Sequence, residues 1–234
     1  MTQTSIRENS MRVRERISRA AARAGRRAEE ITLIAVSKTH PATAIREAYE
    51  AGVRHFGENR VQEWEGKHTG TEGLAAMWHL IGHLQSNKAA RAAKLFHSVD
   101  SVDDLALAER LDRARGEAGL RGKLRVLIEV RVAQEETKSG IAIARLPELA
   151  EKIAELPRVE LAGLMCIPPF LEQAERVRPY FRRLRVLRED LEKKVGFALP
   201  VLSMGMSHDF EVAIEEGATE VRVGTALFGL RTAV

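Results

Sequence analysis

Short apolar runs alternate with amphipathic stretches along the whole chain. The apolar runs, rich in Val, Ile and Leu, predict strands at 32–38, 53–56, 77–81, 95–99, 124–132, 159–165, 199–202 and 220–223. Between them, apolar residues recur at helical spacing and predict helices that include 41–51, 102–118, 146–156, 172–194 and 208–216. Such alternation is typical of a parallel sheet covered by helices.

Eight strand–helix units favour a closed barrel over an open sheet. Several runs, such as 31–36, are apolar on both faces, which suits burial between a barrel interior and a helical layer. An open doubly wound sheet is the alternative, but no Gly-x-Gly-x-x-Gly follows the first strand. We therefore predict an α/β fold: a single (β/α)8 TIM barrel domain over residues 1–234.

The amphipathic N-terminal stretch predicts an extra helix that packs under the barrel. Its apolar positions recur at helical spacing and are Ile6, Val13, Ile17, Ala20 and Ala24. Acidic residues within it argue against a transit peptide.

Active groups of such barrels lie at the C-terminal ends of the strands. The first strand ends in Ser37-Lys38. Lys38 is therefore expected to point into the barrel mouth, where partial burial favours the neutral amine that attacks carbonyl compounds. Most lysines at strand ends are simply solvated, so this placement alone does not make Lys38 functional.

The loops after the last two strands are rich in small and hydroxyl residues. Ser203, Gly205 and Ser207 follow the seventh strand, and Gly224 and Thr225 follow the eighth. Loops at these positions form the common phosphate site of the fold, because free backbone amides attract an anion. Ser207 could instead be only a helix cap and Gly224 only a turn residue, but two adjacent loops of this composition favour a phosphate site.

Two other strand ends carry candidate residues. Arg222 lies within the apolar run 221–223, where an unpaired charge is costly. It either pairs with an acid of the barrel such as Glu129 or faces a ligand. Asn59, after the second strand, can bond a ligand hydroxyl or an ordered water.

Charge and composition exclude several classes of function. The net charge is +4, but basic and acidic residues are interleaved along stretches such as 172–194, so no nucleic-acid-binding stripe is predicted. No apolar run approaches the roughly 20 residues that cross a bilayer. The single cysteine, Cys166, excludes an internal disulfide and fits a cytoplasmic protein. His79 and His83 lie across a strand and its loop, so we predict no metal site there.

The strand ends also resemble those of a known family. The matching stretches are Ala35-Val36-Ser37-Lys38, Phe56-Gly57-Glu58-Asn59-Arg60-Val61-Gln62-Glu63, Trp78-His79-Leu80-Ile81-Gly82-His83-Leu84-Gln85-Ser86-Asn87-Lys88, Gly163-Leu164-Met165, Leu202-Ser203-Met204-Gly205-Met206-Ser207 and Val221-Arg222-Val223-Gly224-Thr225-Ala226-Leu227-Phe228-Gly229. Together they are highly specific. By these motifs the chain resembles the pyridoxal phosphate homeostasis proteins of the YggS/PROSC type.

The resemblance implies a barrel like the N-terminal domain of alanine racemase, with pyridoxal 5′-phosphate (PLP) held as a Schiff base on Lys38. It implies a phosphate site at the last two loops, and does not distinguish which serine contacts the phosphate. Arg222 would lie near the pyridine nitrogen and weaken the ring as an electron sink. The cofactor-binding residues expected in this way are Lys38, Asn59, Ser203, Ser207, Arg222, Gly224 and Thr225.

Family members are regarded as cytosolic carriers or regulators of PLP supply, so we expect a non-catalytic protein whose recipients are PLP-dependent apoenzymes. We also expect a monomer, because nothing in the sequence resembles a hydrophobic interface beyond the needs of the barrel itself. The alternative is a PLP-dependent amino-acid racemase of low activity. Racemases of this type use a tyrosine of an additional domain as second base, whereas Tyr49 and Tyr180 lie in helical patterns here and no such domain is expected before Val234. A third hypothesis is a sugar-phosphate isomerase. Lys138 is expected to be only a loop charge at the mouth.

Overall fold

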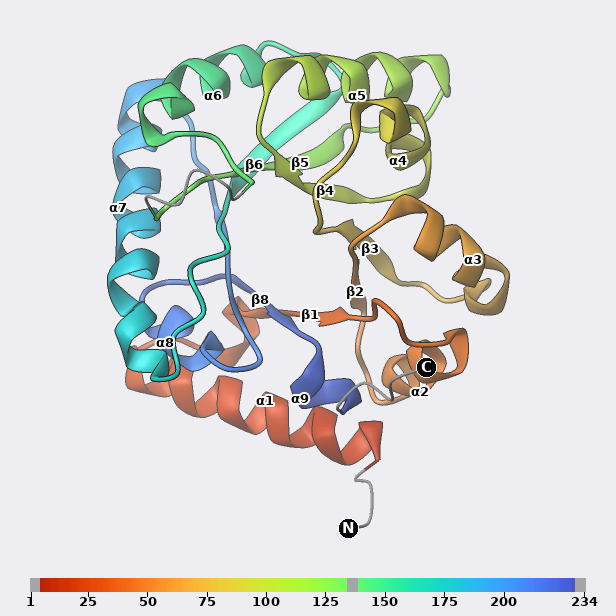
Figure 1. Cartoon of the computed structure of the whole chain (residues 1–234), viewed down its shortest axis with the longest axis vertical. Helices are drawn as coiled ribbons and strands as arrows, with labels where there is room; N and C mark the ends of the chain where they lie inside the picture. Colours follow the sequence, from red (N-terminus) through yellow and green to blue (C-terminus); the bar gives the residue numbers. More distant parts are fainter. Residues whose placement is uncertain (1–4, 134–138, 230–234) are drawn as a thin grey trace.

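The computed structural model describes residues 5–133 and 139–229, and a ring of parallel strands forms its centre (Figure 1). Each strand pairs with the next along the chain, and the eighth pairs with the first. The strands are β1 (Thr32–Val36), β2 (His55–Glu58), β3 (Met77–Leu80), β4 (Ser98–Val102), β5 (Leu124–Glu129), β6 (Val159–Met165), β7 (Val201–Met206) and β8 (Glu220–Val223). The predicted eight-stranded barrel is therefore confirmed, and the open sheet is excluded.

Helices cover the outside of the ring (Figure 1). The α-helices are α1 (Ile6–Arg23), α2 (Ala42–Glu50), α3 (Val61–Thr71), α4 (Ala89–Leu95), α5 (Leu105–Glu117), α6 (Leu146–Ala154), α7 (Arg178–Val195), α8 (Phe210–Glu215) and α9 (Thr225–Phe228). Short 3-10 helices are η1 (Ala28–Glu30), η2 (Ser86–Lys88), η3 (Ile143–Arg145) and η4 (Ala174–Val177). Helix α5 shows how the sequence sets them: Asp104 caps the Leu107 amide, and Leu107 and Leu111 are buried one turn apart.

Helix α1 is the predicted extra N-terminal helix. It begins at a capping box in which Ser5 and Glu8 each accept from the other's backbone amide. Its buried face contains Val13, Ile17 and Ala20. It packs against α8, α9 and α2, so it completes the outer layer where the first and last strands meet (Figure 1).

Several element bounds differ from the predicted ones. Strand β1 ends at Val36, so Lys38 lies in the turn that follows. The strand predicted at 95–99 begins at Ser98, because Leu95 still belongs to α4. Helix α3 is missed by the sequence pattern because its amphipathic signal is weak and Gly66 and Gly70 interrupt it.

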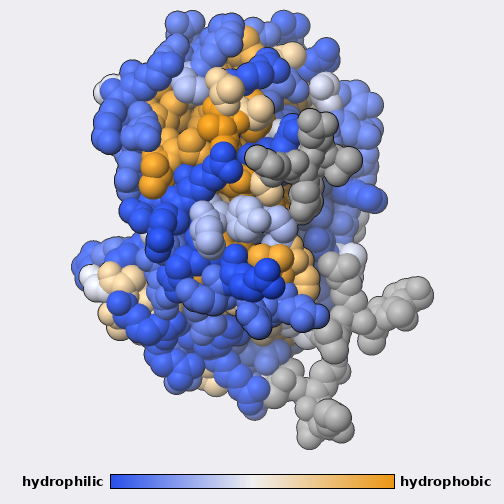
Figure 2. Space-filling model, turned by 60° about the vertical axis from the view of Figure 1, so that its left-hand side comes forward, coloured by the Kyte–Doolittle hydropathy of each residue, from blue (hydrophilic) through white to orange (hydrophobic). Residues whose placement is uncertain are grey.

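Apolar side chains pack in two regions. Outward-facing strand residues such as Phe56 and Val126 pack against the helices in the main core. A small cluster of Leu127, Ala162 and Met165 forms separately from it. Figure 2 shows apolar residues gathered in a hollow of one face, ringed by hydrophilic residues.

Within the described residues, every helix is too short or too polar for a transmembrane segment.

Gly163 marks a very close approach of β6 to β7. A Cβ at this position would lie 2.0 Å from the carbonyl oxygen of Val201, so we expect Gly163→Ala to lower the free energy of unfolding by about 3 kcal/mol. Gly66 in α3 is the matched control, because a Cβ there meets nothing within 4 Å. Gly66→Ala should stabilise the protein by about 0.5–1 kcal/mol. Urea denaturation measures both, and a fully stable Gly163→Ala variant would contradict this strand packing.

Candidate functional site

A cavity of about 460 Å³ opens at the C-terminal ends of the strands, and we call it the mouth cavity. Its volume is that of a small-molecule site. Ile167 and Phe170, which are partly exposed, contribute apolar lining. Six of the seven residues expected to bind a cofactor line this cavity: Lys38, Asn59, Ser207, Arg222, Gly224 and Thr225.

Lys38 reaches the mouth cavity from the turn after β1 and is half-buried. The preceding residue, Ser37, is fully buried, and its hydroxyl donates to the Glu58 carboxylate at 2.7 Å. The Ser37 amide donates to the Gly57 carbonyl oxygen at 3.0 Å. These bonds attach the start of the lysine turn to the neighbouring strand β2. Lys138, the second lysine considered for the mouth, lies outside the described residues.

The last two loops meet beside the end of β1. The Ser207 hydroxyl accepts hydrogen bonds from the amides of Gly224 and Ala226, each at 3.2 Å. A Cβ on Gly224 would lie 3.5 Å from the carbonyl oxygen of Val36, so the final loop lies directly against the first strand. Thr225 is exposed and lines the mouth cavity. Hydroxyls and amides suited to an anion therefore share one cavity with the lysine.

Gly205 has a packing role that the sequence pattern did not indicate. Its φ is +91°, and a Cβ would lie 2.6 Å from Cβ of Ala213 and 2.8 Å from Cα of Phe210. The glycine is therefore required where β7 packs against the start of α8.

Arg222 is buried and is held by two neutral acceptors, one in β7 and one directly after β6. Its Nη1 donates to the Ser203 hydroxyl and its Nη2 to the Cys166 carbonyl oxygen, both at 2.8 Å. One predicted alternative was an ion pair with Glu129, but the guanidinium bonds these neutral groups instead, as far as the described residues show. Arg222 also lines the mouth cavity, as the other alternative requires. Ser203 is fully buried beside Arg222, whereas Ser207 lines the cavity. Burial raises the pKa of the Cys166 thiol to about 12, so this cysteine is structural.

Glu129 is a cavity residue that the sequence analysis treated only as a partner for Arg222. It ends β5, is 4% exposed and lines the mouth cavity. Burial, and to a lesser degree the Asp103 carboxylate, raise the pKa of Glu129 to about 7, against an opposing effect of Arg222. The sequence pattern did not single it out, because the strand was predicted to run to Val132, whereas β5 ends at Glu129.

Replacing this carboxyl group with an amide tests its environment. Because the folded pKa of Glu129 lies above the ordinary value of 4.5, ionisation costs stability, and wild type loses stability as pH rises from about 4.5 to about 7. Glu129→Gln stays neutral. We therefore expect the stability of the variant relative to wild type to increase over that pH range and then level off. Urea denaturation at several pH values measures this, and a constant difference would show that Glu129 ionises normally.

Asn59 is placed by the close packing of two loops. A Cβ on Gly82 would lie 2.5 Å from the backbone oxygen of Asn59, so the loop after β3 lies against the loop after β2. The Ser101 hydroxyl donates to the Gly82 carbonyl oxygen at 2.7 Å and fixes that approach. Glycine at 82 therefore allows both loops to reach the mouth cavity.

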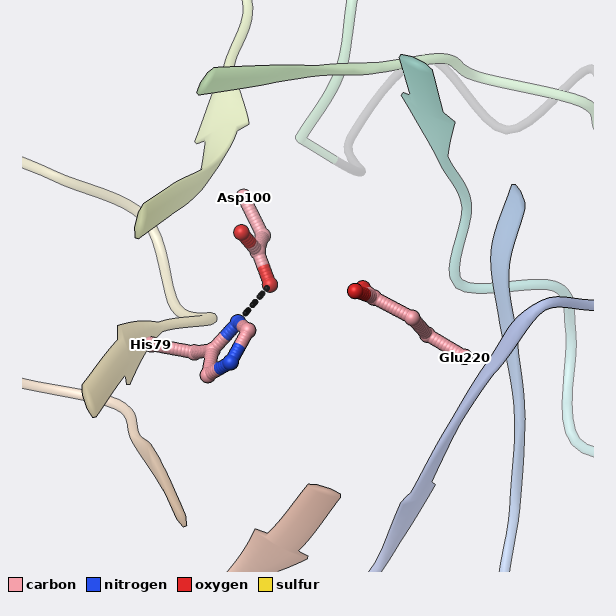
Figure 3. Close-up of side chains that lie close together, drawn as sticks. All are labelled: His79, Asp100 and Glu220. Atoms are coloured by element: carbon pink, nitrogen blue, oxygen red, sulfur yellow. Dashed lines mark hydrogen bonds and ion pairs between the residues drawn. The ribbon is translucent and has the colours of Figure 1, made fainter. Parts of the chain in front are cut away.

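Away from these loops, the barrel contains a buried polar cluster (Figure 3). His79 of β3, Asp100 of β4 and Glu220 of β8 point toward one another, with ligand-type atoms within 4.8 Å. His79 Nδ1 lies 3.2 Å from Asp100 Oδ2, and His79 Nε2 lies 3.0 Å from Nδ1 of His55. The Arg125 guanidinium donates to Glu220. Both ring nitrogens of His79 therefore already have partners.

This arrangement makes the cluster a hydrogen-bonded part of the barrel core. One oxygen of Glu220 bonds Arg125, and the other is buried without a partner among the described residues. Burial raises the pKa of Glu220, which favours a proton on that carboxyl group. His83, considered with His79 in the sequence, is instead exposed and lies 3.8 Å from Asp103.

His55 is hydrogen-bonded to His79 of this cluster and should lower the stability of the fold in acid. Burial, helped by His79, lowers the pKa of His55 to about 4 from 6.5. As pH falls from about 6.5 to about 4, the unfolded chain takes up the proton before the folded one, so this group destabilises the fold. We expect wild type to lose stability relative to His55→Gln over that range. Thermal denaturation at pH 7.5 and 5 measures the change, and a gap independent of pH would contradict it.

Comparisons with known proteins match the chain over almost its whole length. Residues 9–232 match the family model of the alanine racemase N-terminal domain. The chain is 49% identical over 224 residues to the pyridoxal phosphate homeostasis protein of Aquifex aeolicus, covering 96% of this chain and 97% of that protein. It is 47% identical to the protein of the same name from Escherichia coli K12, covering 97% of each.

Solved structures show the same fold. PipY of Synechococcus elongatus PCC7942, solved with PLP bound, superposes with a TM-score of 0.81 at 42% identity, covering 91% of this chain and 100% of that one. An alanine racemase of Clostridium difficile 630 gives a TM-score of 0.72 at 15% identity, covering 97% of this chain and 58% of that one. The latter likeness concerns the fold alone.

A closed barrel that brings the lysine after its first strand to the loops of its last two strands is an alanine racemase N-terminal-type domain. The match covers only 58% of the racemase chain, so that chain extends beyond the shared barrel. Within this class, the chain is 47–49% identical to pyridoxal phosphate homeostasis proteins over nearly its full length. The chain therefore belongs to the pyridoxal phosphate homeostasis protein family.

Proposed function

We propose that this chain binds PLP as a Schiff base on Lys38 and acts in intracellular PLP homeostasis as a carrier or regulator, without efficient catalysis. One observation carries the proposal: the mouth cavity is lined both by Lys38 and by the hydroxyl and amide groups around Ser207 and Gly224. The names of the relatives and the PLP-bound form of PipY support it.

The donors of the mouth cavity fit this cofactor. PLP supplies an aldehyde for an amine and a ring that can withdraw electrons. Lys38 would provide the amine. The hydroxyls of Ser207 and Thr225 would donate to the phosphate, because hydroxyls are among its usual donors. The amide of Gly224 donates to the Ser207 hydroxyl and so would hold that hydroxyl toward the phosphate. Asn59 would bond the ring hydroxyl.

Arg222 would donate to the pyridine nitrogen. A guanidinium keeps its proton in proteins, so the nitrogen would remain unprotonated and the ring would be a weak electron sink. Ser203, buried against Arg222, would orient this donor, which leaves the phosphate role to Ser207. Weak activation of the ring favours holding the cofactor over turnover.

The low-activity racemase remains the alternative because of Glu129. A carboxyl group with a pKa of about 7 in the mouth cavity can accept or donate a proton. The tyrosines are placed elsewhere: Tyr49 is in α2 with its ring 4.0 Å from the Arg54 guanidinium, and Tyr180 is in α7. Sensitive detection of D-alanine formed from L-alanine separates the two functions. Sustained turnover that is lost in Lys38→Ala would favour the racemase.

The carrier would act as a cytoplasmic monomer and deliver PLP to PLP-dependent apoenzymes. Delivery to a protein is compatible with a cavity that is open to solvent and bordered by exposed Ile167 and Phe170.

Reduction and mapping test the central assignment. Purified protein mixed with PLP should turn yellow, and borohydride followed by peptide mapping should place the phosphopyridoxyl group on Lys38. Lys38→Ala should abolish the colour. Lys88→Ala is a matched control, because Lys88 is also a half-buried lysine but lies in η2, away from the mouth cavity. A label found only on Lys88 or Lys138 would refute the site. A protein that is colourless once free PLP has been removed would favour a sugar-phosphate isomerase.

A further inference from the structure

The turn that carries Lys38 is attached to helix α3 by a buried ammonium group. Lys67 Nζ lies 2.8 Å from the Ser37 carbonyl oxygen, 3.0 and 3.1 Å from the two Glu58 oxygens and 3.1 Å from Glu63 Oε1. The side chain of Lys67 is 12% exposed and that of Glu58 is fully buried. This ion-pair cluster therefore holds the residue immediately before Lys38.

The residue immediately after Lys38 is held by the same cluster. The Thr39 amide donates to Glu63 Oε1, which also accepts from Lys67. Glu63 and Lys67 are one helical turn apart on α3, so both reach the turn from one face. The cluster thus binds the backbone on both sides of Lys38.

Thr39 needs such support because its backbone is strained. Its φ is +66°, and it is the one non-glycine residue with positive φ in the described ranges 5–133 and 139–229. The left-handed region is unfavourable for a β-branched residue, and strained residues persist where their surroundings hold them. The His40 amide donates to the Ser37 carbonyl oxygen at 3.0 Å, which closes the turn.

The Glu63 carboxylate is the member of the cluster whose pKa is lowered. Burial acts to raise the pKa of Glu63, but the Thr39 amide and Lys67 outweigh this effect and lower it. Glu63 is thus ionised over the neutral range and can keep both bonds. The side chain of Glu63 is 24% exposed. Its bond to Thr39 therefore acts mainly on the geometry of the turn.

We propose that Glu63 and Lys67 are positioning residues that hold the Lys38 amine in the mouth cavity by clamping Ser37 and Thr39. The inference rests on the proposed function of Lys38 and extends it: the lysine is presented by an ion-pair cluster on α3. Glu63 and Lys67 act through the turn, and neither lines the mouth cavity.

Removing one carboxylate tests the clamp. In Glu63→Ala the Thr39 amide loses its acceptor, and we expect PLP to bind roughly tenfold more weakly, the order of the cost of a left-handed residue. Glu63→Gln keeps an acceptor oxygen and should retain most of the affinity. Combining Glu63→Ala with Thr39→Gly should restore binding, because glycine adopts this φ without the clamp. A general loss of helix packing would not be rescued in this way.

The matched control is Glu65→Ala. Glu65 is on the same helix, is 27% exposed and pairs with Arg91 at 2.6 Å rather than with the lysine turn. We expect it to leave PLP binding unchanged. Melting temperatures show whether each variant is folded. Should Glu63→Ala unfold, Glu63→Asp carries the test, because it keeps the charge but shortens the reach to Thr39.

A second readout needs no cofactor. Acetylation of Lys38 relative to Lys88 by acetic anhydride, followed by mass spectrometry, measures how the turn presents its amine. Loosening the turn should speed Lys38 acetylation severalfold in Glu63→Ala, and Thr39→Gly should reverse this. Unchanged PLP binding and acetylation in Glu63→Ala, or no rescue by Thr39→Gly, would overturn the clamp. If wild type takes no PLP on Lys38, the proposed function fails, whereas acetylation still decides the clamp.

Discussion

The pairing of β1 with β8 is the constraint on which the site depends. Leu33 and Ala35 stand opposite Val221 and Val223, so the end of the first strand and the loop after the last strand emerge side by side. Gly224 then lies against Val36, and the turn with the lysine shares a cavity with the hydroxyl and amide groups. Without closure of the barrel, these groups would belong to opposite edges of a sheet.

Each ionisable group inside the barrel is stabilised in a different way. Arg222 is satisfied by a hydroxyl and a carbonyl oxygen, so it needs no acidic partner. Glu129 instead keeps its proton to an unusually high pH. Asp100 and His79 bond one another, away from the mouth. Since burying an unpaired charge is expensive, these separate solutions let the barrel be polar inside and remain folded.

The sequence was sufficient to predict the barrel and the cavity members that follow a strand directly. Lys38 and Gly224 could be found because parallel strands send their C-terminal ends to one side. The separation of Ser203 from Ser207 could not, because a register shift between Ser203 and Met206 interrupts the simple alternation of faces. Nor could the contact of Glu63 with Thr39, which depends on how α3 packs beside the turn and leaves no periodic signal.

Helix α1 completes the same closure from the outside. The side-chain amide of Asn9 donates to the Leu227 carbonyl oxygen at 3.1 Å, so helices α1 and α9 are packing partners. During synthesis on the ribosome, the segment that carries Lys38 emerges long before β8 and α9 exist. A nascent chain therefore displays Lys38 before the loops after β7 and β8 exist, and the mouth cavity can form only after α9 has been made.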